Sequence, residues 1–423
     1  MSLLFSTASA TWGIAALATG GVIVRPWRLP EAMWAVLGAV ALVGLGLLPW
    51  RSAVAGVLNG SDVYLFLTGM MLLAELARRE GLFDWLAVVA VNHARGLPAR
   101  LFGLTYAVGT LVTVFLSNDA TAVVLTPAVY AAARAAGAEP LPYLFVCAFI
   151  ANAASFVLPI SNPANLVVFS AHMPALAGWL QQFALASVAA IGATYVALRL
   201  NLRDAIASEV LVARIEQPEL GHGGRIAAAG IAATALALLS CSAFGLRLGL
   251  STFLCASAAA LVILLLRRQS PWPVLKGVSW GVLPLVAGLF VIVEALGQTG
   301  IIAAINRALA DTVAASPAGA TWATALLLAL ASNLMNNLPV GLIAGSVLAA
   351  DHAPQHIAAA ALIGVDLGPN LSVTGSLATI LWLAALRREG ATVGAWQFIR
   401  LGATVMLPAL VLSTLALLLS PAP

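Results

Sequence analysis

Charged residues are scarce in this chain of 423 residues: only 9% are Asp, Glu, Lys or Arg, whereas 62% are hydrophobic. Ordinary globular domains carry about 25% charged residues, so the composition excludes a water-soluble fold and indicates a protein that crosses a membrane many times. The twenty basic residues include a single lysine, Lys276, and stand alone or in pairs between apolar runs. A nucleic-acid surface needs a basic patch, so we expect no nucleic-acid partner.

Cysteine is also scarce, and no part of the sequence has the spacing of a metal site. Cys147, Cys241 and Cys255 lie apart in apolar segments, so we expect free thiols rather than disulfides. The five histidines fall in expected loops or interfacial segments, without an HExxH pattern. We therefore expect no metal, no cofactor and no enzymatic activity. The N-terminus has no basic segment before its first apolar run, which we interpret as a retained span.

Long apolar runs dominate the chain. Their hydropathy predicts an all-α polytopic membrane protein with about ten transmembrane spans. Two of these, 140–170 and 357–386, are unusually long and are interrupted by Pro and Asn, so we expect two discontinuous helices. The predicted spans are 6–24, 31–49, 62–77, 140–170, 175–198, 225–243, 246–266, 278–297, 357–386 and 397–419.

Two further apolar stretches are each divided by a polar cluster. The cluster that starts at Asn118 lies between the runs 101–116 and 122–133, and neither run reaches the ~20 residues that a span needs. Asn337 stands 219 positions after Asn118, in a second break of the same kind. We expect each stretch to form a re-entrant helical hairpin. The two predicted hairpins are 99–135 and 318–350.

The same offset of 219 positions relates other residues of the two halves. Gly69 corresponds to Gly288, Glu75 to Glu294, and the turn glycine at 81 to that at 300. Because one offset links spans and breaks in the same order, we infer an internal repeat, and five crossings per unit give the two units inverted topology. The predicted units are an N-terminal repeat, 1–198, a cytoplasmic linker, 199–224, and a C-terminal repeat, 225–423.

The basic residues agree with this topology. If the N-terminus lies outside, seventeen of the twenty basic residues fall on the cytoplasmic side, and only Arg51, Arg247 and Arg307 fall outside.

Four polar breaks, two at the hairpin tips and two inside the discontinuous helices, carry the functional interpretation. Backbone groups left unpaired at a mid-membrane break are tolerated only where protein buries them or a water-filled cavity reaches them. The helices that begin at these breaks present free N–H donors to a bound solute. Amide and hydroxyl side chains add neutral donors and acceptors, so the site suits a small polar solute, neutral or anionic. The predicted solute-binding residues are Asn118, Thr121, Ser161, Asn162, Asn165, Asn336, Asn337, Asn370, Thr374 and Ser376.

Two carboxyl groups, Asp119 and Asp366, lie within the breaks. A poorly hydrated site favours the neutral form of a carboxyl group, so reversible protonation of these residues would couple transport to protons. Glu75 and Glu294 form a repeat-related second pair of candidate proton relays. Glu75 lies one turn from two arginines, so an interfacial ion pair is the alternative for that residue.

At these motifs the sequence resembles the arsenical-pump membrane protein (ArsB) family of arsenite efflux permeases, within the ion transporter superfamily. The resemblance extends over essentially the whole chain. Its most specific stretch is Asp366–Trp382 (DLGPNLSVTGSLATILW), followed by Asn336–Pro339 and by Asn118–Asp119 with Leu125–Pro127. The Ser161–Pro163 break is shared more widely across the superfamily.

The resemblance implies export of arsenite, and of antimonite, in exchange for protons across the bacterial inner membrane. Some relatives also work with a soluble arsenite-stimulated ATPase, and the Gly- and Ala-rich spans permit a homodimer. The chain departs from the pattern at Asn152, where some relatives have an acid, and at Asn370, where some have a basic residue. Both departures change which charged side chains the site contains, and therefore bear on the number of protons exchanged.

Three alternatives compete with this interpretation. Sodium–proton exchange or sodium-coupled anion uptake on the same fold is the nearest, and the stretch 366–382 argues against it. A membrane-embedded enzyme acting on a lipid would need clustered metal-binding acids or histidines. A membrane scaffold without transport would not need repeated mid-membrane breaks.

Overall fold

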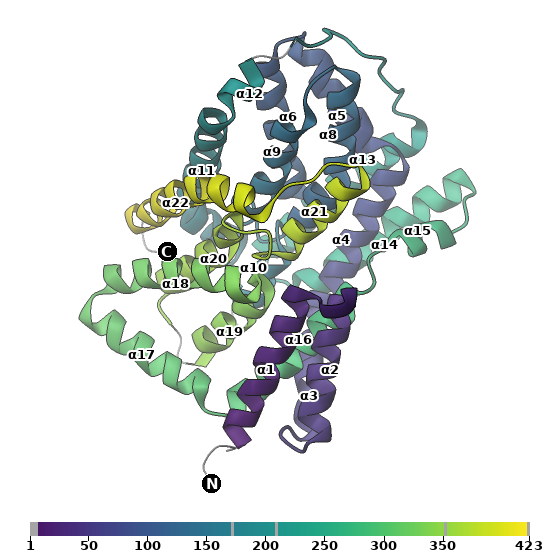
Figure 1. Cartoon of the computed structure of the whole chain (residues 1–423). Helices are drawn as coiled ribbons and strands as arrows, with labels where there is room; N and C mark the ends of the chain where they lie inside the picture. The colour runs from purple at the N-terminus through teal and green to yellow at the C-terminus, as the bar shows by residue number, and fades with distance from the viewer. Residues whose placement is uncertain (1–6, 171–172, 208–209, 351–352, 421–423) are drawn as a thin grey trace.

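The computed structural model describes residues 7–170, 173–207, 210–350 and 353–420, and this part of the chain is helical without a strand (Figure 1). By length and composition, seven of the described helices are able to cross a membrane, or nine if two bent helix pairs each count as one span. The prediction of an all-α polytopic membrane protein is confirmed, and the count of ten spans stays a prediction. The predicted first span begins at residue 6, which lies outside the described residues.

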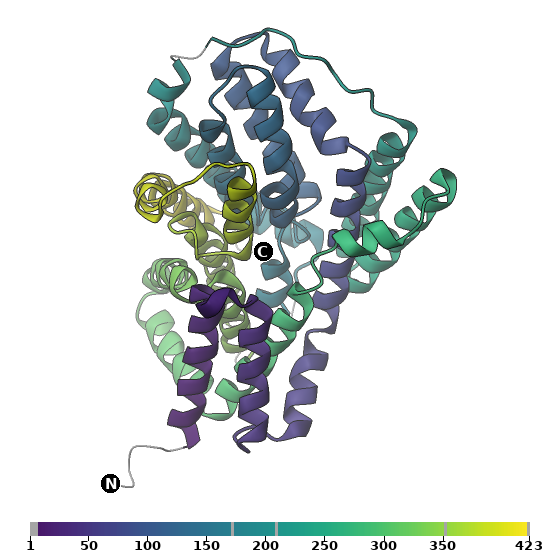
Figure 2. The same ribbon diagram turned by 45° about the vertical axis from the view of Figure 1, so that its right-hand side comes forward.

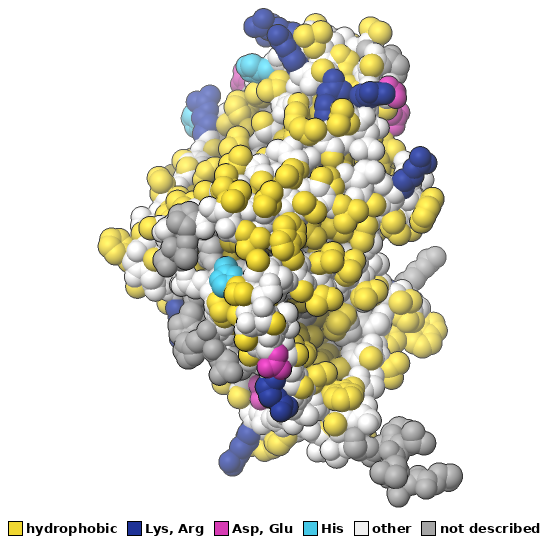
Figure 3. All heavy atoms as spheres, turned by 90° about the vertical axis from the view of Figure 1, so that its left-hand side faces the viewer, with side chains coloured by type: hydrophobic (Ala, Val, Ile, Leu, Met, Phe, Trp, Pro, Cys, Tyr) yellow, Lys and Arg dark blue, Asp and Glu magenta, His cyan; other side chains and the backbone are white. Residues whose placement is uncertain are grey.

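The surface is that of a protein surrounded by lipid. On the face shown in Figure 3, apolar side chains cover much of the middle of the molecule, whereas most of the visible basic side chains lie toward the top. Large apolar side chains such as Leu17, Leu265 and Leu334 are 75%, 67% and 76% exposed. An apolar surface of this extent is costly in water and is stable in a bilayer.

The N-terminal half starts with two helices and a bent pair, followed by a short helix, a hairpin, a broken helix and a closing helix. The predicted span 31–49 is shorter in the structure, because Gly46 turns the chain with φ +71° and Pro49 precedes a new helix. The helices are α1 (Thr7–Val24), α2 (Glu31–Gly44), α3 (Trp50–Asn59), α4 (Ser61–Arg79), α5 (Leu82–Ala94), α6 (Pro98–Phe115), α7 (Asn118–Ala120), α8 (Thr126–Ala135), α9 (Pro140–Ala153), α10 (Pro163–Val168) and α11 (Leu176–Asn201).

The C-terminal half has elements of the same kinds in the same order. It is preceded by α12 (Arg203–Ala207) in the connecting segment. Its helices are α13 (His222–Ala243), α14 (Leu248–Arg267), α15 (Trp272–Gly277), α16 (Val282–Gln298), α17 (Ile301–Ala315), α18 (Pro317–Met335), α19 (Asn337–Ala350), α20 (Gln355–Leu367), α21 (Leu377–Arg388) and α22 (Ala395–Leu419).

Close helix packing also repeats between the halves. α4 packs against α14, and α16 packs against α2. In the first pair a methyl group on Gly69 would lie 2.8 Å from the carbonyl oxygen of Thr252, and in the second a methyl group on Gly288 would lie 2.8 Å from that of Ala35. Glycine is therefore required at both positions for the backbones to approach. The inverted orientation of the two halves stays a prediction.

The connecting segment is bound to the N-terminal half rather than free. The side chain of Asn92 on α5 donates to the carbonyl oxygen of Ile215 over 3.2 Å and accepts from its N–H over 2.9 Å. The N–H of Val212 donates to the carbonyl of Ala136, over 2.9 Å. The segment crosses the top of the molecule in Figure 2, between α12 and α13.

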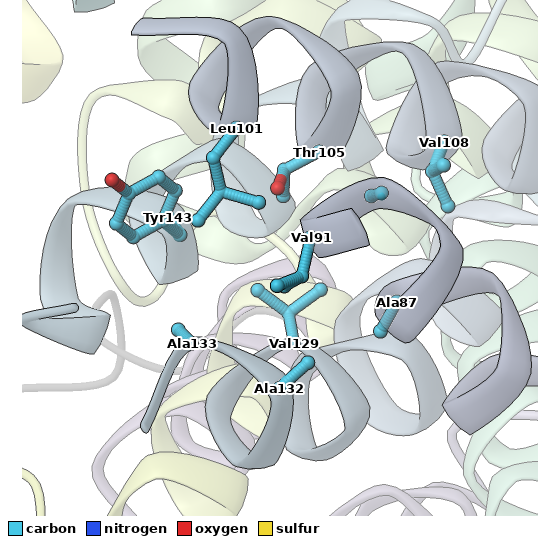
Figure 4. Close-up of a pocket in the computed structure, with 10 residues that line it drawn as sticks. Ala87, Val91, Leu101, Thr105, Val108, Val129, Ala132, Ala133 and Tyr143 are labelled. Atoms are coloured by element: carbon cyan, nitrogen blue, oxygen red, sulfur yellow. The ribbon is translucent and has the colours of Figure 1, made fainter. Parts of the chain in front are cut away.

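A small void of about 10 Å³ lies among α5, α6, α8 and α9 (Figure 4). Leu101, Val91, Val108 and Val129 point into it. Its wall is largely apolar and includes none of the predicted site residues, so we assign it to packing between the first hairpin and its neighbours α5 and α9.

Candidate functional site

Four helices begin at one small cavity between the two halves. α7, α10, α19 and α21 start at Asn118, Pro163, Asn337 and Leu377, and all four residues line a cavity of about 10 Å³, which we call the central cavity. This volume is close to that of one water molecule. Helix starts carry a partial positive charge, so the cavity attracts electron-rich oxygen atoms. The remaining lining residues are Leu67, Asp119, Asn162, Val282, Leu338 and Ala378.

The hairpin tip at Asn118 follows from its local sequence. Ser117 caps the new helix, because its hydroxyl accepts the N–H of Ala120 over 3.2 Å. Pro127 lacks an N–H, so the helix before it cannot keep its regular hydrogen bonds and widens into a π-helical turn, Thr121–Leu125. The hydroxyl of Thr126 donates to the carbonyl of Thr121, over 3.2 Å.

Each hairpin tip is tied to the broken helix of its own half by one backbone hydrogen bond. The N–H of Asn118 donates to the carbonyl of Ser161 over 3.1 Å, and the N–H of Asn337 donates to that of Gly375 over 2.8 Å. These two bonds hold four polar breaks around the central cavity.

Asp119 lies between the central cavity and a larger one. Its half-buried side chain lines both, and the larger cavity has a volume of about 670 Å³. We call this larger one the charged cavity. The charged residues in its wall, besides Asp119, are Glu75, Arg78, Asp84, Lys276, Arg388 and Glu389.

A third cavity, of about 1010 Å³, lies at the other ends of α4 and α16, and we call it the opposite cavity. Its charged wall residues are Asp62, Arg247 and Glu294. Within the described part of the chain it shares no lining residue with the central cavity, whereas the charged cavity shares Leu67, Asp119, Pro163 and Val282. The central cavity therefore adjoins only one of the two large cavities.

Asp366 lies apart from the cavities, at the end of α20, and is fully buried. Asn162 Nδ2 donates to its Oδ1 over 2.8 Å, and Asn162 Oδ1 accepts the N–H of Ala164 over 3.0 Å. Among the described residues Asp366 Oδ2 has no hydrogen-bond partner. Asn162 thus connects the buried carboxyl group to the central cavity.

Several predicted solute-binding residues instead satisfy groups of the protein. The hydroxyl of Thr121 lies 2.8 Å from that of Thr113, inside the hairpin. Ser161 Oγ donates to the carbonyl of Val114 over 3.0 Å. Asn165 Nδ2 donates to three backbone carbonyls exposed by the break between α9 and α10. These are Ser155, Leu158 and Pro159, at 2.9, 3.0 and 3.3 Å.

The same holds in the C-terminal half. Asn370 accepts from Asn152 Nδ2 over 2.9 Å. Thr374 donates to the carbonyl of Asn333 over 3.2 Å. Ser376 caps α21 by accepting the N–H of Thr379. Asn336, at φ +74°, accepts the N–H of Leu338 over 3.4 Å.

The repeat-related glutamates have different surroundings. The carboxylate of Glu75 is only 6% exposed and accepts hydrogen bonds of 2.6–2.7 Å from Arg78 and Arg79. Glu294 is half-buried in the opposite cavity, and among the described residues its carboxylate accepts a single long bond, of 3.4 Å, from Gln298. The geometry favours the ion-pair interpretation of Glu75.

Asn152 and Asn333 have roles at the breaks that the sequence pattern did not predict. Asn152 bonds three side chains of the other half. Asn333 donates to the carbonyl of Gly368 over 2.9 Å and accepts from Ser372 over 2.6 Å. Each lies in the last turn of the helix that precedes a polar break, α9 for Asn152 and α18 for Asn333. An amide side chain at such a position was the signal available in the sequence.

Comparison with known proteins identifies the family of this chain. A family model described as citrate transporter (CitMHS) matches residues 15–364. The chain is 27% identical over 417 residues to an arsenical pump membrane protein of Escherichia coli, covering 94% of this chain and 95% of the relative. It is 28% identical over 364 residues to an arsenical pump membrane protein of Yersinia enterocolitica, covering 83% and 84%. These relatives confirm the resemblance found in the motifs.

Solved structures show the same fold at low identity. The Alcanivorax borkumensis YdaH transporter superposes with a TM-score of 0.58 at 16% identity, over 87% of each chain. Neisseria gonorrhoeae MtrF, from a class of antimetabolite efflux pumps, superposes with a TM-score of 0.57 at 12% identity, over 100% of this chain and 97% of that one. The apolar helices and the bacterial relatives make this a multi-pass protein of the bacterial inner membrane. The chain belongs to the citrate transporter (CitMHS) family of membrane transporters.

Proposed function

We propose that this chain exports arsenite from the cytoplasm in exchange for protons, by alternating access. The observation that carries the proposal is the similarity to arsenical pump membrane proteins over 94% of the chain. That similarity includes the stretches that line the central cavity. The geometry of the site supports each part of the proposal separately.

The central cavity suits arsenous acid chemically. Arsenous acid is a weak acid that is mostly neutral in the cytoplasm, and it carries three hydroxyl groups. The amides of Asn118, Asn162 and Asn337 and the nearby helix starts can exchange hydrogen bonds with such hydroxyls. None of the three cysteines is among the residues that line the cavity. A thiolate would bind trivalent arsenic too tightly for rapid release.

The cavity of about 10 Å³ is smaller than arsenous acid. The hairpin tips and the broken helices must therefore separate before the solute binds. The charged cavity reaches the central cavity while the opposite cavity does not, which fits a carrier open to one side at a time. By the positive-inside rule, the cationic residues Arg78, Lys276 and Arg388 support a cytoplasmic position for the charged cavity.

Proton coupling is assigned to Asp119 and Asp366. Asp119 is the one charged residue among those described at the central cavity, and it also faces the charged cavity, so it can exchange protons with the cytoplasm. Asp366 is linked to the same cavity through Asn162. Glu294, in the opposite cavity, is assigned to proton transfer on the far side.

Transport of a tricarboxylate is the second candidate, because the matching family model is described as a citrate transporter. Binding a multiply charged anion requires cationic side chains at the site. Arginine and lysine are absent from the described wall of the central cavity. This favours a neutral solute over citrate, and over a sodium-coupled anion.

The same chemistry extends to antimonite, whose neutral form also carries three hydroxyls. A soluble arsenite-stimulated ATPase stays a prediction of the resemblance, and a homodimer stays a prediction from the Gly- and Ala-rich spans. Purification of the intact protein with and without a co-expressed ATPase, followed by mass measurement, tests both.

The test of the proposal is arsenite accumulation in everted membrane vesicles that contain this protein. We expect accumulation that requires a proton gradient, collapses with an uncoupler and ignores sodium. Asp119→Asn should abolish the gradient-driven component, whereas Asp311→Asn, an acid outside the cavities, should not. Accumulation of citrate in place of arsenite, or dependence on sodium, would overturn the proposal.

A further inference from the structure

The two broken helices are related by an offset of 214 positions, which differs from the offset of the hairpins. This offset pairs Asn152 with Asp366, Asn162 with Ser376 and Asn165 with Thr379. Asn162 and Ser376 occupy equivalent places, because each caps the second arm of its broken helix. The correspondence therefore has structural as well as sequence support.

In the set formed by Asn152, Ser376 and Thr379, with Asn370 as a further partner, the side-chain polar groups are hydrogen-bonded. Asn152 Oδ1 accepts from the hydroxyl of Ser376 over 3.3 Å. Asn152 Nδ2 donates to the hydroxyl of Thr379 over 3.4 Å and to Asn370 Oδ1 over 2.9 Å. All four side chains are buried. The amide of Asn152 thus acts as an acceptor toward Ser376 and as a donor toward Thr379.

The equivalent set around Asp366 is incomplete in one respect. Asp366 Oδ1 accepts from Asn162 over 2.8 Å, as Asn152 Oδ1 accepts from Ser376. The counterpart of the other bond, from Asn152 to Thr379, would join Asp366 Oδ2 to Asn165 Oδ1. In the described structure both of these buried oxygens have no hydrogen-bond partner. Both are acceptors if Asp366 is ionised, so one donor is missing.

Asn165 cannot supply that donor by turning its amide. Its Nδ2 is held by three backbone carbonyls, from Ser155, Leu158 and Pro159. A flipped amide would place Oδ1 against all three oxygens and leave them unsatisfied. Asn165 Oδ1 is therefore a fixed acceptor on α10, and α10 packs against α20, which carries Asp366.

A protonated carboxyl group has the shape and the hydrogen-bonding pattern of an amide: one acceptor oxygen and one donor. We propose that Asp366 is protonated on Oδ2 in this conformation and donates that hydrogen to Asn165 Oδ1, directly or through one buried water. Asn165 is then the positioning residue for the transported proton. The proposal deepens the role of Asp366 in the proposed function, because it says which bond holds the proton and which conformation keeps it.

The surroundings of Asp366 offer no cation in place of the proton. The titratable residues on the elements packed against α20 are Tyr143 and Cys147 on α9, Tyr195 and Arg199 on α11, and Arg400 on α22. Arg400 is exposed, and none of the ion pairs in the described chain includes Asp366. His356 on α20 itself lies about 15 Å away along the helix axis. A proton is the simplest way to satisfy both buried oxygens.

Release of the proton follows from the same geometry. Asn162 lies at the start of α10 and Asn165 one turn later, so a movement of α10 relative to α20 removes both partners of Asp366 together. The carboxyl group then loses the acceptor for its hydrogen and is free to give the proton to water. Loading and release are thus tied to the relative position of the two halves.

Infrared spectroscopy of the purified full-length protein tests the proposal without any substrate. We expect a carbonyl-stretch band of a protonated carboxylic acid at neutral pH, lost in Asp366→Asn and kept in Asp119→Asn. Asn165→Thr and Asn165→Val form a matched pair, since both remove the amide and only threonine keeps an acceptor. The band should stay at a hydrogen-bonded frequency in Asn165→Thr and move to a higher frequency in Asn165→Val.

Thermal unfolding supplies a second readout. Asp366→Asn should leave the midpoint equal to or above that of the wild type, because its amide reproduces the bonds of Asn152, whereas Asp366→Leu should lower it. Four results would each overturn the proposal. Two concern the band itself, which would be missing or would survive Asp366→Asn. The others are equal bands in the two Asn165 variants and equal loss of stability in the two Asp366 variants. So would sodium-dependent stabilisation that Asp366→Asn abolishes. Failure of arsenite export in vesicles would leave these readouts unchanged.

Discussion

The N–H of Asn118 donates a hydrogen bond of 3.1 Å to the carbonyl oxygen of Ser161, which ties the first hairpin tip to the first broken helix. The side chain of Ser161 strengthens this junction. Its hydroxyl donates to the carbonyl of Val114 over 3.0 Å and accepts the N–H of Leu158 over 3.2 Å. One buried serine thus joins three segments of interrupted backbone.

Replacing that serine should destabilise the junction. We expect Ser161→Ala to cost about 1–3 kcal/mol of unfolding free energy, because it leaves a buried donor and a buried acceptor unpaired. Thermal unfolding in detergent measures the loss. Ser240→Ala is the matched control, since that exposed serine also bonds a backbone carbonyl. Equal midpoints for the two variants would contradict the assigned role.

A methyl group added at Gly69 or at Gly288 should disrupt the helix contact there to a similar extent. In each case the added carbon would lie 2.8 Å from a backbone carbonyl oxygen, so we expect Gly69→Ala and Gly288→Ala to lose about 1–3 kcal/mol through overpacking. Gly13→Ala has open space around it and should gain up to about 1 kcal/mol from helix propensity. The measurement is the unfolding midpoint of each purified variant. A tolerated Gly288→Ala beside a disruptive Gly69→Ala would argue against equivalent packing in the two halves.

The two repeat-related glutamates should differ in their contribution to stability. Glu75→Gln removes the charge that binds Arg78 and Arg79 at 2.6–2.7 Å, and we expect a loss on the order of 1.5–3 kcal/mol. Glu294→Gln breaks no ion pair, so its midpoint should stay close to that of the wild type while proton-driven export declines. Unfolding midpoints and vesicle transport, measured on the same preparations, separate the two effects. Loss of stability in Glu294→Gln with none in Glu75→Gln would reverse the assignment.

The predicted orientation in the membrane can be tested by labelling. In a variant without Cys147, Cys241 and Cys255, Lys276→Cys places a thiol in the charged cavity and Gln298→Cys one in the opposite cavity. A membrane-impermeant thiol reagent should label Lys276→Cys in everted vesicles and Gln298→Cys in intact cells with a permeabilised outer membrane. Labelling of both from the same side would refute the assignment of the two large cavities to opposite sides of the membrane.

Much of the fold follows directly from the residues. The lack of charge, the apolar runs and the polar clusters predicted the helices and their breaks, because lipid requires every backbone group to be paired within the protein. Gly81 and Gly300, related by the predicted offset, both adopt left-handed conformations, at φ +72° and +81°, at the starts of α5 and α17. Turn chemistry of this kind is visible in a sequence.

The functions of individual polar residues were less predictable. Asn118, Asn162 and Asn337 line the central cavity, whereas Asn165, Ser161 and Thr374 bond to backbone carbonyls. A sequence shows that a polar side chain stands at a break, but it does not show which carbonyls the break exposes to it. The relation between Asn152 and Asp366 was missed for a related reason: the broken helices follow an offset of their own, shorter by five positions than that of the hairpins.

The correspondence of the two large cavities has a consequence for the cycle of this carrier. Val123 and Pro127 line the charged cavity, and their counterparts 219 positions later, Leu342 and Ser346, line the opposite one. In the proposed alternating-access cycle, each half would adopt the conformation that the other half has in this structure. Such an exchange of conformations would close the charged cavity and open the opposite one with few new kinds of contact. The proposed second state would then need no contact types beyond those already present in the first.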